Sequence, residues 1–275
     1  MHRKIDPAIE WLSQCVAPLS PKEFLFNQAA SLLAKSGQSK PPFNPQKAIP
    51  PSIKRIEMAK LSRDGMLIPV QGGFIIKINS EKPQVRQNFT CAHEIGHTFF
   101  YDITGEWPWR PYESMSTYWG EEGLCYEFAE EILMPRLIME KITSSLNPSI
   151  TSLQELLKTF QVSTEAMVRR ISRLDLWQCI LTILVENREN PTTLRRKLVG
   201  KHKRFQYYDI NWDKLLSEGL SPYTAFQNPG SLERSTISCS ELFRRGKKDG
   251  QCSIESFRLS GASYPAVICI IVPDN

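Results

Sequence analysis

Two histidines four residues apart, with a glutamate directly after the first, form the pentapeptide His93-Glu94-Ile95-Gly96-His97. On a helix, residues at positions i and i+4 project from the same face, so the imidazoles of His93 and His97 can reach one metal ion. Glu94 stands beside them, where its carboxylate can accept a proton from a water molecule on that metal. This combination is typical of zinc hydrolases and indicates a peptidase before other enzyme classes.

A catalytic zinc ion needs three protein ligands and an open position for water. The chain has only four histidines, and the two outside the motif, His2 and His202, lie far from it in sequence. A carboxylate is therefore expected as the third ligand. Glu121 and Glu122 open the next predicted helix and are both candidates. Asp102 is a weaker one, because it lies only five residues after the motif, near the end of the same helix.

The motif needs a helix to hold it, and the spacing of apolar residues predicts one over about residues 85–103. A second predicted helix, over 121–134, stops at Pro135 and would deliver the glutamates to the first. Upstream, apolar runs on both sides of the glycine-containing turn 71–73 predict a hairpin over 66–78. Proteases of the zincin type usually place such a sheet beside the metal helix, with an edge strand that lines the substrate cleft, and this hairpin lies directly upstream of the motif.

The rest of the chain alternates between helical and strand-like patterns. A capping box at 20–23 predicts the start of a helix, and a proline-rich connector over 41–51 should be extended. Residues 152–174 predict a helix, a turn and a second helix. Two apolar runs, 179–185 and 266–272, are suited to central strands of a sheet.

The composition is that of a globular protein, with 275 residues of which 41% are hydrophobic and 23% charged. Seven scattered cysteines, never spaced as C-x-x-C, predict buried free thiols rather than disulfides or a cysteine zinc site. The net charge of +5 permits contact with nucleic acid or an acidic protein without requiring either. Neither a membrane span nor a signal-peptide core is visible, so we expect a cytoplasmic protein.

Three stretches of the chain resemble the ImmA/IrrE family of metallopeptidases. They are Gly65–Phe74, Arg86–His97 and Glu122–Pro135. In the second stretch the family pattern is roughly R-x-R-F-T-x-A-H-E-x-G-H, and this chain has Asn88 where the family has its second arginine. The joint occurrence of these stretches is far more specific than H-E-x-x-H alone, and the clear resemblance covers about residues 53–175.

The resemblance implies an α+β protein in three parts. A zincin-like peptidase domain of the gluzincin type would occupy residues 1–147, with N-terminal helices over 1–40 and the proline-rich connector over 41–51. A helix-turn-helix-like segment would follow over 148–176, and an α/β GAF-like sensor or regulatory domain over 177–275.

The resemblance also implies a metal site and a substrate. One ion, usually zinc, with another divalent metal such as Mn²⁺ as an alternative, would be bound by His93, His97 and Glu122. A shift of one residue would make Glu121 the ligand instead. Characterised relatives are site-specific proteases that cleave a helix-turn-helix repressor of the XRE type in a stress or mobile-element response. We therefore expect a protein substrate of that kind.

The expected chemistry is metal-assisted hydrolysis of an amide bond. Glu94 would remove a proton from water and pass it to the leaving amine. A hydrogen-bond donor is also needed for the oxyanion that develops on the scissile carbonyl. Tyr118, Tyr112, Arg110 and Tyr101 are near enough in sequence to supply it, and the sequence does not choose between them.

A second hypothesis is a DNA-binding transcription regulator in which the metal site is structural or vestigial. The middle segment could bind DNA through its second helix, which carries Arg169, Arg170 and Arg173. The intact Glu94 argues against this hypothesis, because a structural site needs no general base. Direct DNA binding is therefore the less favoured expectation.

Overall fold

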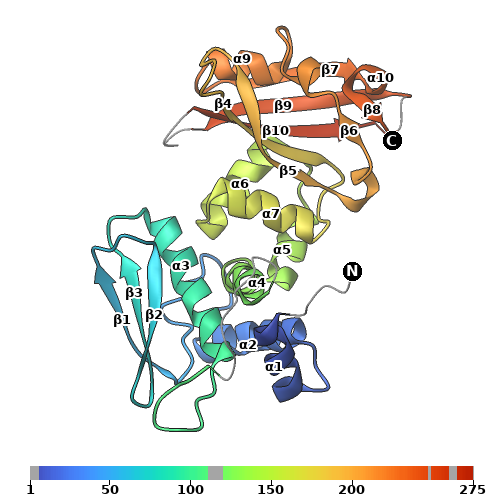
Figure 1. Cartoon of the computed structure of the whole chain (residues 1–275). Coiled ribbons are helices and arrows are strands. Elements are labelled where there is room, and N and C mark those ends of the chain that lie inside the picture. The colour runs from blue at the N-terminus through green and yellow to red at the C-terminus, as the bar shows by residue number, and fades with distance from the viewer. Residues whose placement is uncertain (1–5, 111–119, 247–248, 260–264, 275) are drawn as a thin grey trace. The chain divides into compact units, whose positions relative to one another are not determined.

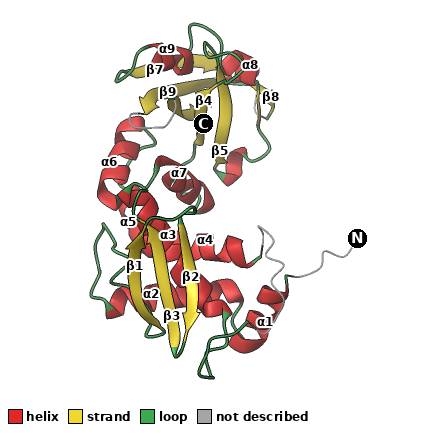
Figure 2. Cartoon of the chain, turned by 60° about the vertical axis from the view of Figure 1, so that its left-hand side comes forward, coloured by secondary structure: helices red, strands yellow, loops and turns green. Residues whose placement is uncertain are grey.

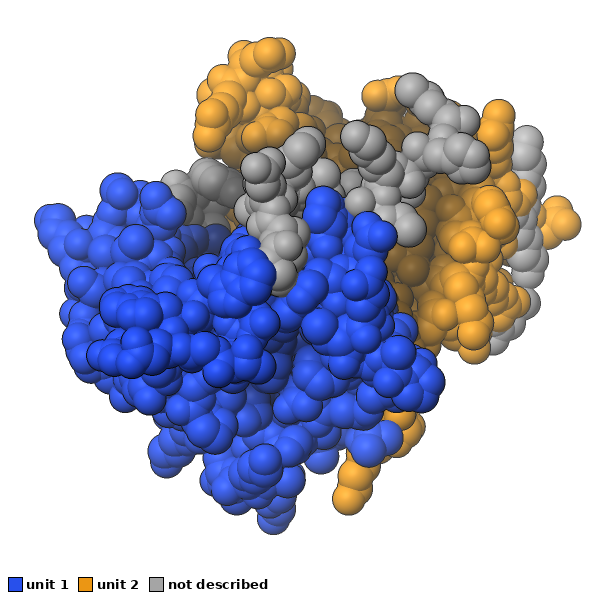
Figure 3. Space-filling model, turned by 60° about the horizontal axis from the view of Figure 1, so that its bottom comes forward, with its two compact units in different colours: residues 1–138, 159–163 blue, residues 139–158, 164–275 orange. Residues whose placement is uncertain are grey.

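The chain folds into a mixed α/β structure with helices and several sheets. The computed structural model describes residues 6–110, 120–246, 249–259 and 265–274. Two compact units are present, the first formed by residues 1–138 and 159–163 and the second by residues 139–158 and 164–275 (Figure 3). The predicted division at residues 147 and 176 stays a prediction.

The first unit combines helices with a small sheet. Its elements are α1 (Pro7–Val16), α2 (Pro21–Lys35), β1 (Ile53–Ala59), β2 (Gly65–Val70), β3 (Gly73–Asn79), α3 (Gln84–His97), the 3-10 helix η1 (Thr98–Phe100) and α4 (Glu121–Leu133), and α5 (Arg136–Thr143) begins in it. The capping box that predicts the start of α2 is confirmed, because the Ser20 hydroxyl accepts from the backbone N–H of Glu23 and the Glu23 carboxylate accepts from that of Ser20.

The sheet of the first unit has the strand order β1-β3-β2. The predicted hairpin is confirmed, with β2 antiparallel to β3, while β1 pairs with β3 in parallel. Gly73 has a φ of +154°, and a Cβ there would lie 2.0 Å from the carbonyl oxygen of Ser52, so the turn requires glycine. Within the described residues, β2 pairs on one side only and is an edge strand.

Helix α3 lies between this sheet and α4 (Figures 1 and 2). It ends at His97, six residues earlier than the predicted helix. The chain continues as the 3-10 turn η1, and Tyr101 then takes an extended conformation. Asp102 pairs with Trp109 through two backbone hydrogen bonds of 3.0 and 3.1 Å, which fixes the chain in a turn back on itself.

The second unit is built around a five-stranded antiparallel sheet. Its elements are α6 (Ile150–Phe160), α7 (Thr164–Arg173), β4 (Ile180–Glu186), β5 (Leu194–Lys201), η2 (Lys203–Phe205), β6 (Asp209–Ile210), α8 (Trp212–Leu215), α9 (Ser221–Gln227), β7 (Leu232–Ser238), α10 (Cys239–Leu242), β8 (Phe243–Arg245), β9 (Gln251–Leu259) and β10 (Ala266–Pro273). The strand order is β5-β4-β10-β9-β7, so the two predicted central strands are confirmed as the adjacent strands β4 and β10.

Helices cover both faces of the five-stranded sheet. Helix α9 packs on one face, where Leu184, Phe226 and Val267 share a core cluster. Helix α7 packs on the opposite face against β4 and β5. A Cβ on Gly200 would lie 2.0 Å from Oγ of Ser172 in α7, so a glycine in β5 permits this close packing. Arg170 of α7 is fully buried, which removes it from any surface that could contact DNA.

All seven cysteines are free, and six of them are buried, which confirms the predicted buried thiols with Cys15 as the exposed exception. No helix among the described residues is long and apolar enough to cross a membrane.

Candidate functional site

The two histidines of the motif and one glutamate of α4 converge on a single point. The Nε2 atoms of His93 and His97 are 3.0 Å apart. The carboxylate of Glu122 reaches both, with Oε2 at 3.2 Å from Nε2 of His93 and Oε1 at 3.3 Å from Nε2 of His97. Three potential ligand atoms from two helices therefore surround one small volume.

This donor set fits a small divalent metal ion. Zinc binds imidazole nitrogen and carboxylate oxygen at about 2.0–2.2 Å in tetrahedral geometry, which separates neighbouring ligand atoms by about 3.3 Å. The observed separations of 3.0–3.3 Å are close to that value. Hydrogen bonds from the two imidazoles hold the pKa of the Glu122 carboxyl well below its ordinary range, which favours the charged form that binds cations.

The convergence depends on a close approach of α3 and α4. Gly96 faces α4, and a Cβ there would lie 3.2 Å from Cδ1 of Phe128 and 3.3 Å from Cα of Cys125. The absence of a side chain at this position lets the helix backbones lie near enough for Glu122 to reach the histidines. Phe128, with Ala129 and Ile132, forms the buried face of α4, as the sequence predicts.

We expect Gly96→Ala to weaken metal binding. The new Cβ would press on the α4 backbone at Cys125, so α4 and the Glu122 that it carries must shift by a few tenths of an ångström. Overpacking of this kind costs about 1–3 kcal/mol, against about 1 kcal/mol gained from the higher helix propensity of alanine, so the free energy of unfolding should fall by about 1 kcal/mol. Chelator competition and a urea titration measure the two effects.

Gly105→Ala is the matched control, because its Cβ would meet nothing nearer than the carbonyl oxygen of Trp107 at 4.0 Å. Unchanged metal affinity in Gly96→Ala would contradict the importance of the close helix contact.

Glu121, the neighbour of Glu122, occupies a different position. Its side chain is buried, and Oε1 lies 2.5 Å from Nδ1 of His97, on the side of the imidazole opposite to Nε2. A carboxylate at this position holds the imidazole ring in one orientation and keeps the proton on Nδ1, which leaves Nε2 as the ligand atom. By contrast, Nδ1 of His93 is buried without a hydrogen-bonding partner within the described residues.

Two of the predicted oxyanion donors lie behind Glu121. Arg110 donates to both oxygens of the Glu121 carboxylate, at 3.2 Å and 2.8 Å. Its guanidinium also lies over the ring of Tyr101, 4.6 Å from the ring centroid. Arg110 is therefore held by a bidentate ion pair with the carboxylate that supports His97, and Tyr101 contacts Arg110.

Glu94 lies outside the cluster of ligand atoms and lines a small pocket that adjoins it at His93. This pocket has a volume of about 140 Å³, and its lining includes His93, Glu94, Gly65 and Tyr126. Burial raises the pKa of the Glu94 carboxyl above its ordinary value, more than the neighbouring imidazoles lower it. A carboxylate whose pKa is raised toward neutrality is a better proton acceptor, as a general base requires.

The remaining sequence candidates are apart from the cluster or outside the described residues. Asp102 accepts hydrogen bonds from the backbone and hydroxyl of Thr104, at 2.9 and 2.7 Å, and is not among the grouped ligand atoms. Tyr112 and Tyr118 lie outside the described residues. His202 belongs to the second unit.

Tyr126 is a candidate residue that the sequence reasoning missed. It lies one helical turn after Glu122, so both side chains project from the same face of α4. Its ring centroid is 4.7 Å from that of His93, and the residue is 36% exposed and lines the small pocket. The i, i+4 spacing from the candidate ligand was the available signal.

Comparison with known proteins adds an independent line of support. Residues 56–172 match the sequence model of the Peptidase_M78 family, described as the IrrE N-terminal-like domain. The chain is also 34% identical over 111 residues to the radiation response metalloprotease IrrE of Deinococcus radiodurans. That match covers 38% of this chain and 32% of the relative, so the chain spans about a third of the relative's length. The matched part is therefore a domain of the metallopeptidase class.

More narrowly, this domain belongs to the ImmA/IrrE family, and the resemblance seen in the sequence is confirmed. Among solved structures, a Mycobacterium tuberculosis transcriptional regulator superposes with a TM-score of 0.52 at 10% identity, covering 90% of this chain and 76% of that one. At such low identity the likeness concerns the fold alone. A metallopeptidase domain of this family implies a divalent metal ion, typically zinc.

Proposed function

We propose that the protein is a zinc-dependent endopeptidase in which His93, His97 and Glu122 bind one metal ion and Glu94 is the general base. The observation that carries the proposal is the convergence of two imidazole nitrogens and one carboxylate within 3.0–3.3 Å. The adjacent pocket that contains Glu94 adds space for the reacting groups. Mn²⁺ is the alternative ion, because carboxylate and imidazole also suit it.

When bound, zinc supplies Lewis-acid chemistry that makes water acidic near neutral pH and polarises the scissile carbonyl. Glu94 then accepts the proton of the attacking water on its carboxylate and transfers it to the leaving amine. The partial burial of Glu94 suits both steps, because its raised pKa lets the carboxyl hold the proton between them.

We propose that Glu121 and Arg110 position His97 as a metal ligand and do not contact the reacting atoms. In this proposal Glu121 orients His97, and Arg110 neutralises the buried charge of Glu121 from the far side. Because Arg110 already binds the Glu121 carboxylate, another residue must donate a hydrogen bond to the oxyanion. Tyr126 lies beside His93 and lines the pocket that contains Glu94, and we propose that its side chain contacts substrate there.

The finer aspects of the function rest on the family resemblance. We propose that the substrate is a helix-turn-helix repressor of the XRE type and that its cleavage starts a stress or mobile-element response. In the same proposal, α6 and α7 form a helix-turn-helix-like segment that serves packing, because α7 lies against the five-stranded sheet and buries Arg170. The antiparallel sheet with helices on both faces is compatible with a GAF-like regulatory domain.

Co-incubation with candidate repressors tests the proposal. We expect the purified full chain to contain about one zinc ion and to cut an XRE-type repressor encoded beside its gene at one site. Removal of the ion with a chelator should stop cleavage, and re-addition of zinc should restore it, as followed by mass spectrometry of the products. Tight operator binding by a metal-free chain, without any cleavage product, would support the DNA-binding regulator instead.

A further inference from the structure

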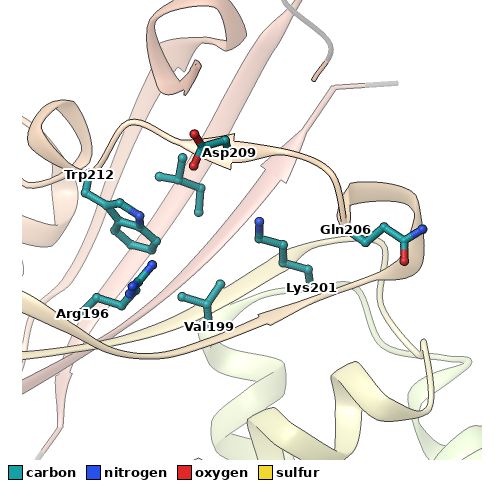
Figure 4. A pocket seen from close by; sticks show the side chains of 7 residues that line it. Arg196, Val199, Lys201, Gln206, Asp209 and Trp212 are labelled. Carbon is teal, nitrogen blue, oxygen red and sulfur yellow. The ribbon is translucent and has the colours of Figure 1, made fainter. Parts of the chain in front are cut away.

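The second unit contains a pocket that lies on one face of its sheet, far along the chain from the metal cluster. Its volume is about 390 Å³, within the range of small-molecule sites. Seven residues line it: Arg196, Val199, Lys201, Gln206, Asp209, Ile210 and Trp212. Figure 4 shows the side chains of β5 projecting toward the segment that carries Asp209 and Trp212.

Strand alternation and a bulge in β5 together bring two cations to this pocket. Val199 and Lys201 alternate onto one face of the strand, opposite Thr182 and Ile180 of β4. The register between β4 and β5 shifts at residue 197, so that Arg196 pairs with Leu184 and joins the same face. Without the extra residue, Arg196 would point to the α7 side, and bulges commonly re-aim side chains next to binding sites.

The chain that follows β5 forms the other wall of the pocket. It folds back over the sheet face through η2, β6 and α8. Ile210 is buried in the core below, and Trp212 packs against two core clusters, so this wall is anchored. The pocket therefore has a fixed apolar floor and polar groups placed around its opening.

These polar groups have few partners of their own. Arg196 lies over the ring of Trp212, 5.3 Å from the ring centroid, and has no carboxylate partner within the described residues. Lys201 donates to the backbone carbonyl of Tyr208, which uses one of its three hydrogens. Burial lowers the pKa of Lys201 because it disfavours the charged ammonium, while the nearby Asp209 carboxylate acts in the opposite direction. A bound anion would stabilise the charged form of Lys201 further. In the part of the chain that the structure describes, the side chains of Asp209 and Gln206 make no hydrogen bond.

We propose that this pocket binds a small anion that carries a planar ring, of the nucleoside monophosphate type. Arg196 and Lys201 bind the anionic group, because guanidinium and ammonium groups pair with phosphate or carboxylate. Trp212, Val199 and Ile210 contact the ring. Asp209 accepts from an amino group at the ring edge, a feature that inorganic anions lack.

Isothermal titration of the whole 275-residue chain tests the site with four probes. Adenosine monophosphate and anthranilate each combine an anion, a planar ring and an amino group, with phosphate in one and carboxylate in the other. Inorganic phosphate and adenosine each supply only part of that combination. We expect at least one of the first two probes to bind at micromolar to millimolar concentration, and to bind at least about tenfold more tightly than both partial probes.

Two adjacent arginines give a matched pair of variants. Arg196→Gln removes the cation that faces the pocket, and we expect it to weaken the bound probe at least about tenfold, the usual effect of losing a hydrogen bond to a charged group. Arg195→Gln removes the same charge from the opposite face of β5, since Arg195 pairs with Val185, and it should leave binding unchanged. Lys201→Met is a second variant in the pocket with the same expected loss.

The proposal is overturned if neither ring-bearing anion binds, if phosphate or adenosine alone binds as tightly, or if Arg195→Gln and Arg196→Gln weaken binding equally. If adenosine monophosphate binds but anthranilate does not, the natural ligand is a nucleotide. If anthranilate binds but adenosine monophosphate does not, the ligand is an aromatic acid. Thermal unfolding of each variant verifies that it is folded before titration.

Discussion

Glu94→Gln is expected to keep the metal ion and to lose cleavage by about 10²- to 10⁴-fold, the usual contribution of a general acid–base group. Glutamine has nearly the same shape but cannot accept the proton of the attacking water. Glu94 also lies outside the group of three ligand atoms, so its replacement leaves that group intact. Metal content by elemental analysis and the rate of product formation from the repressor, measured on the same preparation, check both parts of the expectation.

Glu81→Gln is a suitable control, because Glu81 forms an exposed ion pair with Lys60 in the same unit. It should alter neither metal content nor rate. Full activity in Glu94→Gln would refute the assigned role, whereas loss of both metal and activity would make Glu94 part of the ligand set.

The second large expected effect is on metal affinity, when either of the two adjacent glutamates at the start of α4 is replaced. We expect Glu122→Gln to abolish tight metal binding, because a neutral amide replaces the charged ligand beside His93 and His97. Glu121→Gln should keep the ligand set but lower metal affinity by about 10- to 100-fold, the usual effect of losing the carboxylate that orients a metal-binding histidine. Competition with a chromogenic chelator measures both affinities.

Arg110→Lys extends this test to the residue that holds Glu121. A lysine keeps the positive charge but cannot form the bidentate contact with Glu121, so metal affinity should fall by less than in Glu121→Gln. If instead Glu121→Gln lost the metal completely and Glu122→Gln kept it, the roles of the two glutamates would be reversed.

Local patterns predicted much of the first unit. The capping box at Ser20 fixes the start of α2, and the turn at Gly73 fixes the hairpin, because each depends on residues close together in sequence. Helix α3 ended earlier than its apolar spacing indicates. After the motif, the backbone pairing of Asp102 with Trp109 holds the chain in a turn, so the helix does not continue.

The candidate site was predictable in its residue types but not in their orientation. Glu121 and Glu122 are equally acidic neighbours, and only the position of α4 directs one carboxylate to Nε2 of His97 and the other to Nδ1. Arg110 was a candidate because of its chemistry, and its ion pair with Glu121 depends on a contact that sequence separation does not reveal. The register shift beside Arg196 has no sequence signature at all.

In the proposed endopeptidase, the edge strand β2 would influence which peptide bonds can be cut. Gly65 at its start lies beside Glu94, since a Cβ there would be 3.5 Å from Oε1 of that residue. A substrate that adds to this edge must be extended over several residues, because strand pairing uses its backbone N–H and C=O groups. A segment inside a helix of the substrate would first have to unfold locally, at a free-energy cost that lowers kcat/KM. The local structure of the substrate, and not only its sequence, would then determine the cleavage site. Interdomain linkers would be cut faster than helices.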